Sequence, residues 1–249
     1  MVGWEYKLMS KETTMESVLI KAAGILDQHK IQHWVTDGTL LGLIRENKIL
    51  PWDTDIDLAV FKKDVSVPNL IMIFINEGFE YLEVLPEVDS LHFRIDNVQL
   101  DINLYTEKSG KTSIKWATNP VGLLDRIIVQ SINKMFEGRK KIDIPSTETS
   151  RVVGLFKIFL SSFGRILSDD FLEKIFTYAR SKYLYLGSQY PSELIEMKKF
   201  NFKGYTINVP INSDEYLRLT YGDDWKTPKK DFVWETDVRN LTVFDHKNK

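Results

Sequence analysis

Cysteine is absent from the 249 residues, and histidine is scarce. The absence of cysteine excludes disulfides and thiolate metal sites, and it suits a reducing compartment. The histidines, His29, His33, His92 and His246, show no metal-ligand spacing. Carboxylates are therefore the side chains left to form a metal site.

Long apolar runs and a large excess of one charge are absent as well. No run approaches the roughly 20 residues of a membrane-spanning helix, and residues 1–10 lack the apolar segment of a signal peptide. The formal net charge of −2 creates no basic field, which argues against a nucleic-acid partner. We therefore expect a cytoplasmic protein that binds no nucleic acid.

Hydrophobic residues make up 43% of the chain and charged residues 27%, values at which a chain of this length buries one sizeable core. In the first half, strand and helix periods alternate. Predicted helices cover residues 12–29, 40–45 and 68–77, and predicted strands cover 31–36, 58–61, 91–95 and 98–105. The pair Asp96-Asn97 between the last two strands predicts a hairpin.

Helical periods dominate the second half of the chain. Predicted helices cover residues 121–136, 151–167, 171–185 and 213–221, and residues 198–209 resemble another hairpin. The fold class is therefore α/β (α+β), with a mixed β-sheet core flanked by helices and a helical second half. We expect residues 1–110 to form the core domain. Residues 111–249 should form a mainly helical accessory region that packs on it and completes a substrate pocket.

Three carboxylates, Asp53, Asp55 and Asp57, lie two residues apart just before a predicted strand. On an extended strand they project from one face, where like charges repel and raise the pKa of at least one carboxyl unless a cation compensates. Oxygen ligands without cysteine favour Mg²⁺ or Mn²⁺ over Zn²⁺. The alternative is an ordinary aspartate-rich turn that begins at Asp53.

Two further motifs favour a metal site over an ordinary turn. Gly38-Thr39 sits where a predicted strand becomes a helix, and exposed backbone N–H groups there suit a phosphate. Asp101 lies on the polar side of an alternating strand, where by itself it would be an ordinary exposed charge. If it converges with Asp55 and Asp57 on a sheet rim, the three carboxylates form a two-metal clamp for phosphoryl transfer.

The order of these motifs along the chain resembles that of a known superfamily. The order Gly38-Thr39, Asp55-Ile56-Asp57-Leu58, Leu100-Asp101-Ile102 is similar to the signature of the nucleotidyltransferase superfamily. The longer string DGTLLGLIREN, followed by ILPWDTDIDL, resembles the LicD/fukutin-related family of phosphotransferases, and YGDDWKTP at residues 221–228 supports it. The resemblance covers residues 30–228, of which residues 106–199 match poorly.

The resemblance implies a nucleotidyltransferase-like fold with its catalytic core in residues 1–110. Such metal-dependent transferases move phosphocholine or an alditol phosphate from a CDP-activated donor to a sugar hydroxyl of a glycan or lipid-linked saccharide, and CMP leaves. Carried over by position, Asp55, Asp57 and Asp101 ligate Mg²⁺ or Mn²⁺, and Asp101 also helps to activate the acceptor hydroxyl. Gly38 and Thr39 hold the donor phosphate.

One departure from the family pattern is Thr54, where members often have aspartate. Asp53 is therefore assigned to substrate binding, outside the ligand set. Arg45 is a further candidate, because its guanidinium suits bidentate phosphate contact, although it could instead pair with Glu46.

The segment 151–167 predicts an amphipathic helix whose cationic residues oppose an apolar side. Amphipathic helices more often pack on the core of their own protein. The alternative is that this helix lies on the inner membrane surface, which would suit a lipid-linked acceptor. Trp52 is predicted to serve packing, and the alternative is a base-stacking platform. Tyr221 and Trp225 are also predicted to serve packing, and the alternative is that they line the acceptor pocket.

Two rival functions stay open. A nucleotidyltransferase would attach NMP to a small molecule or protein with the same carboxylates, and would release pyrophosphate instead of CMP. A non-catalytic family member would act as a binding subunit, but the intact set of Asp55, Asp57 and Asp101 argues against that role.

Overall fold

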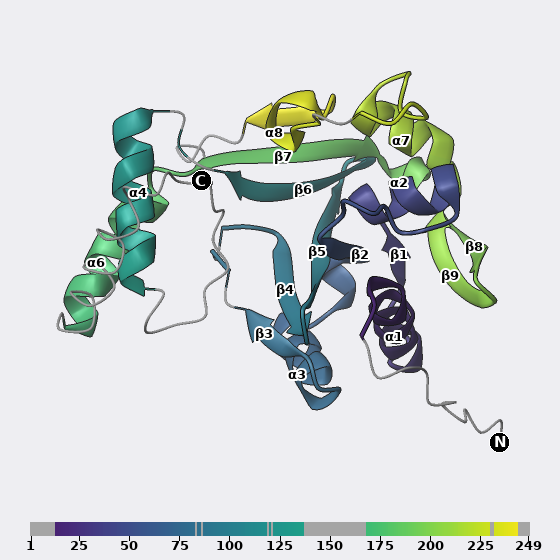
Figure 1. Cartoon of the computed structure of the whole chain (residues 1–249), viewed down its shortest axis with the longest axis horizontal. Coiled ribbons are helices and arrows are strands. Elements are labelled where there is room, and N and C mark those ends of the chain that lie inside the picture. Colours follow the sequence, from purple (N-terminus) through teal and green to yellow (C-terminus); the bar gives the residue numbers. More distant parts are fainter. Residues whose placement is uncertain are drawn as a thin grey trace.

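The computed structural model describes residues 13–82, 84–85, 87–118, 120, 122–136, 168–229 and 232–243 (Figure 1). Its strands are β1 (His33–Val35), β2 (Asp55–Phe61), β3 (Glu80–Leu82), β4 (Ser90–Ile95), β5 (Val98–Lys108), β6 (Lys111–Thr118), β7 (Leu184–Pro191), β8 (Met197–Phe202), β9 (Tyr205–Pro210) and β10 (Leu241–Val243). Its helices are α1 (Met15–Gln28), α2 (Asp37–Glu46), α3 (Val67–Asn76), α4 (Leu123–Phe136), α6 (Asp169–Arg180), α7 (Ser213–Tyr221) and α8 (Trp234–Asp237), with 3₁₀ turns η1 (Lys62–Asp64) and η2 (Ser192–Ile195).

The main sheet is mixed, which confirms the predicted α/β class. Its strand order is β1-β2-β5-β6-β7-β10, and β4 and β3 branch from β5. β2 and β5 run parallel with Asp57 opposite Asp101, whereas β5 pairs antiparallel with both β4 and β6. A parallel pair needs a long crossover, and the chain makes it through η1, α3, β3 and β4.

Alternation along β2 and β5 gives this sheet one apolar and one polar face. Ile56, Leu58 and Leu100 are fully buried in the main core, to which α1 and α3 contribute side chains such as Leu19 and Phe74. The residues between them in sequence point to the opposite face. The two-residue alternation that buries the apolar side chains in the core therefore also places the aspartates of both strands on the opposite face of the sheet.

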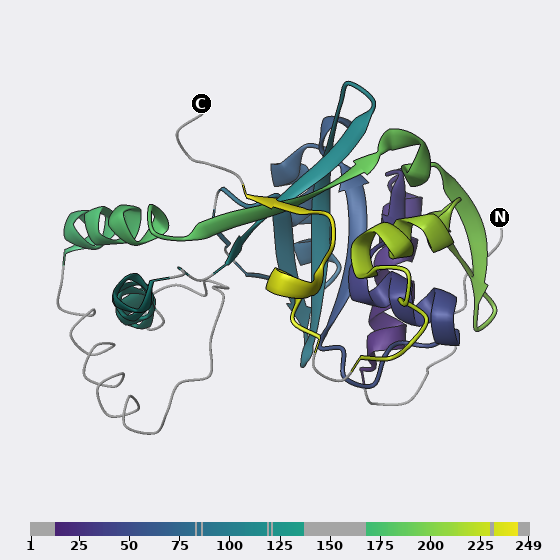
Figure 2. The same ribbon diagram turned by 90° about the horizontal axis from the view of Figure 1, so that it is seen from above.

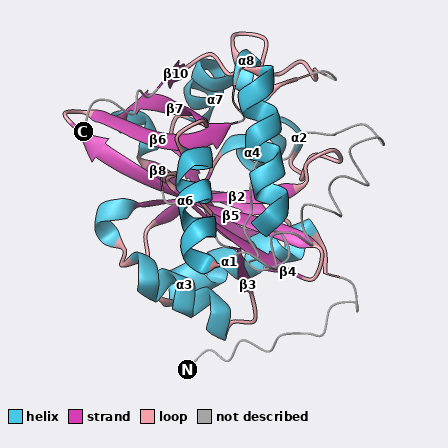
Figure 3. Cartoon of the chain, turned by 90° about the vertical axis from the view of Figure 1, so that its left-hand side faces the viewer, coloured by secondary structure: helices cyan, strands magenta, loops and turns pink. Residues whose placement is uncertain are grey.

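Beyond β5 the chain builds a second, smaller core. α4 and α6 lie past the ends of β6 and β7, apart from α1, α2 and α3 (Figure 1, Figure 2), and in Figure 3 these two helices face the viewer. The buried residues of this core are Leu85, Ala117, Val129, Ile132, Ala179, Tyr183 and Tyr185.

The second half contains more strand than its sequence pattern predicted. The helix predicted over residues 171–185 ends at Arg180, and residues 184–191 instead form β7, which pairs along all 8 residues of β6. Strand pairing over a long sequence distance overrides the local helical spacing here. Gly110, at the expected domain boundary, lies in the turn between β5 and β6, so the sheet continues across that boundary.

The predicted helix at 151–167 lies outside the described residues. Within the part of the chain that the structure describes, no helix combines the length and apolar character needed to cross a membrane.

A buried group of hydroxyls ties α7 to the start of α2. The Tyr216 hydroxyl lies 2.6 Å from Oγ1 of Thr36 and 3.0 Å from the Tyr105 hydroxyl. The ring of Tyr190 stacks on that of Tyr216 with centroids 4.3 Å apart. These contacts fix α7 against the point where β1 ends and α2 begins.

The loop after α2 makes a close backbone contact with Gly42. Asn47 ends the helix in the left-handed region, with φ of 51°. The loop then folds back, so that a Cβ on residue 42 would lie 2.5 Å from the carbonyl oxygen of Lys48 and 3.1 Å from Cγ of Leu50. Glycine at this position lets the loop return from α2 towards β2.

We expect Gly42→Ala to lower the free energy of unfolding by about 1–3 kcal/mol, because the added methyl group would overpack against main-chain atoms. The matched control is Gly24→Ala in α1, where nothing lies within 4 Å of the added Cβ and alanine favours the helix by about 1 kcal/mol. Urea unfolding followed by circular dichroism measures both changes. Equal stability of the two variants would contradict the close contact.

Candidate functional site

Three carboxylates from two neighbouring strands meet on the polar face of the sheet. Asp55 and Asp57 of β2 and Asp101 of β5 each offer one oxygen atom, and these atoms all lie within 4.8 Å of one another. The parallel register that sets Asp57 opposite Asp101 brings them together. We call these three residues the carboxylate cluster; it is the grouping that the sequence predicted.

Asp37, which was not among the predicted site residues, lies close to this cluster. It begins α2 with φ of 48°, a left-handed conformation that aspartate tolerates better than most residues. Burial, and then the charges of Asp55 and Asp101, raise the pKa of its carboxyl to about 7. Asn103 donates a hydrogen bond from Nδ2 to Oδ2 of Asp37 at 3.2 Å. The available sequence signal was its place at the strand-to-helix turn, directly before Gly38.

Negative charge is crowded at this site. Burial raises the pKa of Asp57 well above its usual value, and the charges of Asp55 and Asp37 raise it further. Burial and the charge of Asp55 raise the pKa of Asp53 to about 7, and Oδ2 of Asp53 is buried without a hydrogen-bond partner. A divalent cation would relieve such crowding, and an all-oxygen donor set fits Mg²⁺ or Mn²⁺.

Gly38 and Thr39, predicted to hold phosphate, both support the aspartates. Thr39 is fully buried, and its Oγ1 accepts a hydrogen bond from the backbone N–H of Asp57 at 2.9 Å. A Cβ on residue 38 would lie 2.8 Å from Oδ2 of Asp53, so glycine allows that carboxylate to approach the helix. Because the Thr39 hydroxyl is engaged inside the protein, phosphate binding here would use the backbone N–H groups at the start of α2.

Asp101 is held by two polar neighbours on the same face. Gln99 donates a hydrogen bond from Nε2 to Oδ1 of Asp101 at 3.0 Å, and Nε2 of His92 lies 3.5 Å from Oδ2. His92 stands opposite Asp101 in the β4–β5 register. The hairpin predicted from the sequence could have indicated the contact between His92 and Asp101, because it sets their two strands side by side.

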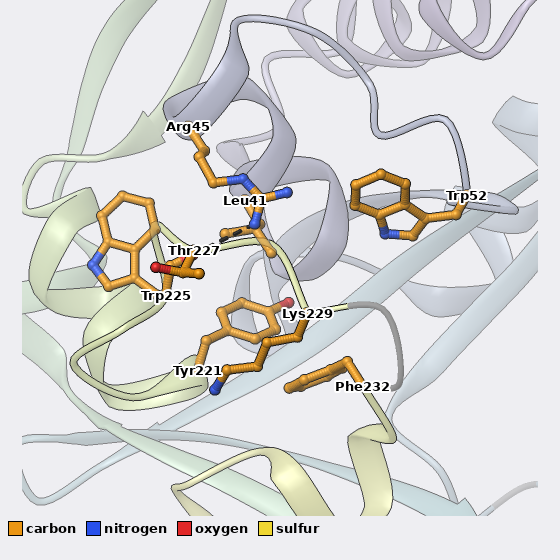
Figure 4. Close-up of a pocket in the computed structure, with 8 residues that line it drawn as sticks. All are labelled: Leu41, Arg45, Trp52, Tyr221, Trp225, Thr227, Lys229 and Phe232. Atoms are coloured by element: carbon orange, nitrogen blue, oxygen red, sulfur yellow. Dashed lines mark hydrogen bonds between the residues drawn. The ribbon is translucent and has the colours of Figure 1, made fainter.

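A hollow lies beside α2, and we call it the aromatic hollow (Figure 4). Its lining residues are Leu41, Arg45, Trp52, Tyr221, Trp225, Thr227, Lys229 and Phe232. Arg45 pairs with Glu46, which was one of its two sequence interpretations, with Nη2 2.9 Å from Oε1, and its side chain also lines the hollow. Trp52, which was predicted to serve packing, is 60% exposed.

The site thus combines a mixed sheet that carries three convergent aspartates with a helix, α2, that begins Asp37-Gly38. Residues 30–116 match the family described as LicD/FKTN/FKRP, nucleotidyltransferase domain. This match confirms, over residues 30–116, the resemblance to the LicD/fukutin-related family that was found in the sequence.

Curated relatives extend this similarity over most of the chain. The chain is 23% identical to "Ribitol-5-phosphate transferase FKTN" of Macaca fascicularis over 94% of its own length and 38% of the relative's. It is 31% identical to the protein of the same name from Mus musculus, over 91% of its own length and 36% of the relative's. The chain thus spans less than two fifths of the length of these relatives.

We expect Asp55→Asn to stabilise the metal-free protein, by about 1 kcal/mol, because it removes a charge that acts on Asp37, Asp53 and Asp57. Carboxyls with raised folded-state pKa values stabilise the fold at low pH and lose that contribution as the pH rises towards about 7. The gain should therefore grow between pH 4 and pH 8 in EDTA. Thermal unfolding against pH measures it, and a variant less stable than the parent at pH 8 would contradict the crowding.

Proposed function

We propose that this chain transfers a phosphorylated small group from a CDP-activated donor to a sugar hydroxyl of a glycan, with Mg²⁺ or Mn²⁺ as the cofactor. The observation that carries the proposal is the carboxylate cluster, whose three oxygens lie within 4.8 Å of one another. Asp37, the first residue of α2, lies close to the cluster and is affected by the charges of Asp55 and Asp101. This is the donor set that phosphoryl transfer requires.

The relatives favour an alditol phosphate over phosphocholine as the transferred group. Two of them carry the name ribitol-5-phosphate transferase. The acceptor is then a hydroxyl of a glycan or of a lipid-linked saccharide. In the reaction, the acceptor oxygen bonds to the phosphorus that carries the small group, the bond from that phosphorus to the bridging oxygen breaks, and CMP leaves with that oxygen.

The metal would be held by Asp55, Asp57 and Asp101, with Asp53 and Asp37 adding negative charge around them. When bound, it would neutralise the donor pyrophosphate and the charge that develops on the leaving CMP. The carboxylates fit this role because burial and the neighbouring negative charges raise the pKa of Asp57, and a bound cation would offset both effects.

The side chains around the cluster orient the reactants. Thr39 fixes the backbone of Asp57, and Gln99 and His92 fix the carboxylate of Asp101. The proton of the acceptor hydroxyl passes to Asp101 or to water beside it, since a carboxylate on a metal is a weak base. The N–H groups at the start of α2 face the donor phosphates.

We expect Asp57→Asn to lower turnover at least about a hundredfold, because it removes a central metal ligand and with it several kcal/mol of transition-state stabilisation. The matched control is Asp64→Asn, an exposed aspartate in η1 directly after β2. The measurement is release of CMP from CDP-ribitol with a sugar acceptor, in Mg²⁺ and in excess EDTA.

EDTA should abolish the parent's activity as completely as the Asp57→Asn substitution does. Near-parental turnover by a folded Asp57→Asn variant would contradict the assignment. Release of pyrophosphate from a nucleoside triphosphate, without release of CMP from any CDP compound, would establish the nucleotidyltransferase rival instead.

A further inference from the structure

The aromatic hollow has a lining that is cationic and aromatic at once. Four of its lining residues are aromatic, namely Trp52, Tyr221, Trp225 and Phe232, and two are cationic, namely Arg45 and Lys229. The lining residues include no carboxylate. Such a surface suits a ligand that joins a flat ring to negative charge.

Positive charge is only partly neutralised around the hollow. The Arg45 side chain is 8% exposed, and Glu46, the carboxylate that pairs with it among the described residues, also lies 2.8 Å from Nζ of Lys48. Lys229 pairs with Asp224 at 3.0 Å, but the Asp224 side chain is 58% exposed. A phosphate on the ligand would therefore meet a guanidinium that shares its counter-ion and a lysine whose partner is largely in water.

The aromatic rings leave a face open for stacking. Trp52 is 60% exposed although its ring lies 6.0 Å from the Arg45 guanidinium. Arg45 points into the space between Trp52 and Trp225, and Tyr221 and Phe232 close the opposite side, their ring centroids 5.3 Å apart (Figure 4). An exposed indole beside a cation is a common platform for a nucleobase.

The hollow lies next to the carboxylate cluster. Trp52 directly precedes Asp53 in the chain, and Leu41 and Arg45 belong to α2, which begins at Asp37. After burial, the charges of Asp37 and Asp57 are the main causes that raise the pKa of Tyr221, which places both carboxylates near its ring. A ligand in the hollow can thus extend one end to the aspartates.

We propose that the aromatic hollow binds the nucleotide half of the activated donor, with the base against Trp52 and the nucleotide phosphate at Arg45. This inference rests on the proposed function and adds the place where the leaving nucleotide is held. The acceptor glycan is the less suitable occupant, because neutral sugar hydroxyls need hydrogen-bond acceptors, and the lining side chains that could accept are the hydroxyls of Tyr221 and Thr227.

The test is calorimetric titration of the protein with CMP, in Mg²⁺ and in EDTA. We expect Trp52→Ala and Arg45→Gln each to weaken CMP binding about tenfold or more, and Trp52→Phe to retain most of the affinity because it keeps an aromatic face. The matched control is Trp234→Ala in α8, a 37% exposed tryptophan outside the hollow, which should bind CMP like the parent. Mn²⁺ titration of each variant should give the parental metal affinity.

Parental CMP affinity in both Trp52→Ala and Arg45→Gln would overturn the inference while leaving the proposed function in place. Failure of the parent to bind CMP, in a preparation that still binds Mn²⁺, would overturn both. Loss of CMP binding in the hollow variants, together with release of pyrophosphate as the only product, would support the hollow and overturn the CDP-donor reaction.

Discussion

The parallel pairing of β2 with β5 is the constraint on which the site depends. It sets Asp57 opposite Asp101, and a slip of one residue would turn Asp101 to the apolar face and bring Leu100 to the polar one. Burial of Leu100 and Ile102 in the main core opposes such a slip. The carboxylates are therefore held in place by hydrophobic burial on the other side of the same sheet.

Contacts near the β2–β5 pair hold the aspartates close together although their negative charges repel one another. Thr39 holds the backbone of Asp57, Gly38 makes room for Asp53, and Asn103 donates to Asp37. Each contact secures a carboxylate in a buried and crowded position where ionisation is unfavourable. Carboxyls whose pKa values are raised in this way, as those of Asp37, Asp53 and Asp57 are, cluster at functional sites.

The sequence was informative wherever the signal is local. Period-two alternation predicted β5 with Asp101 on its polar side, and it placed Asp55 and Asp57 on one face, because each strand carries that information itself. It did not predict β7, whose strand state depends on pairing with β6, which lies far away in the sequence. Nor did it assign Asp37 or His92 to the site, since their roles arise from the turn before α2 and from register with a neighbouring strand.

The hydroxyl contact between Thr36 and Tyr216 joins residues that are 180 positions apart. At a synthesis rate of about 5–20 residues per second, roughly 10–40 s separate their appearance during translation. The strands that bear the aspartates can pair during that interval, while the start of α2 still lacks its partner from α7. The growing chain can therefore pair β2 with β5 before α7 exists, and its site is completed only when α7 has been synthesised.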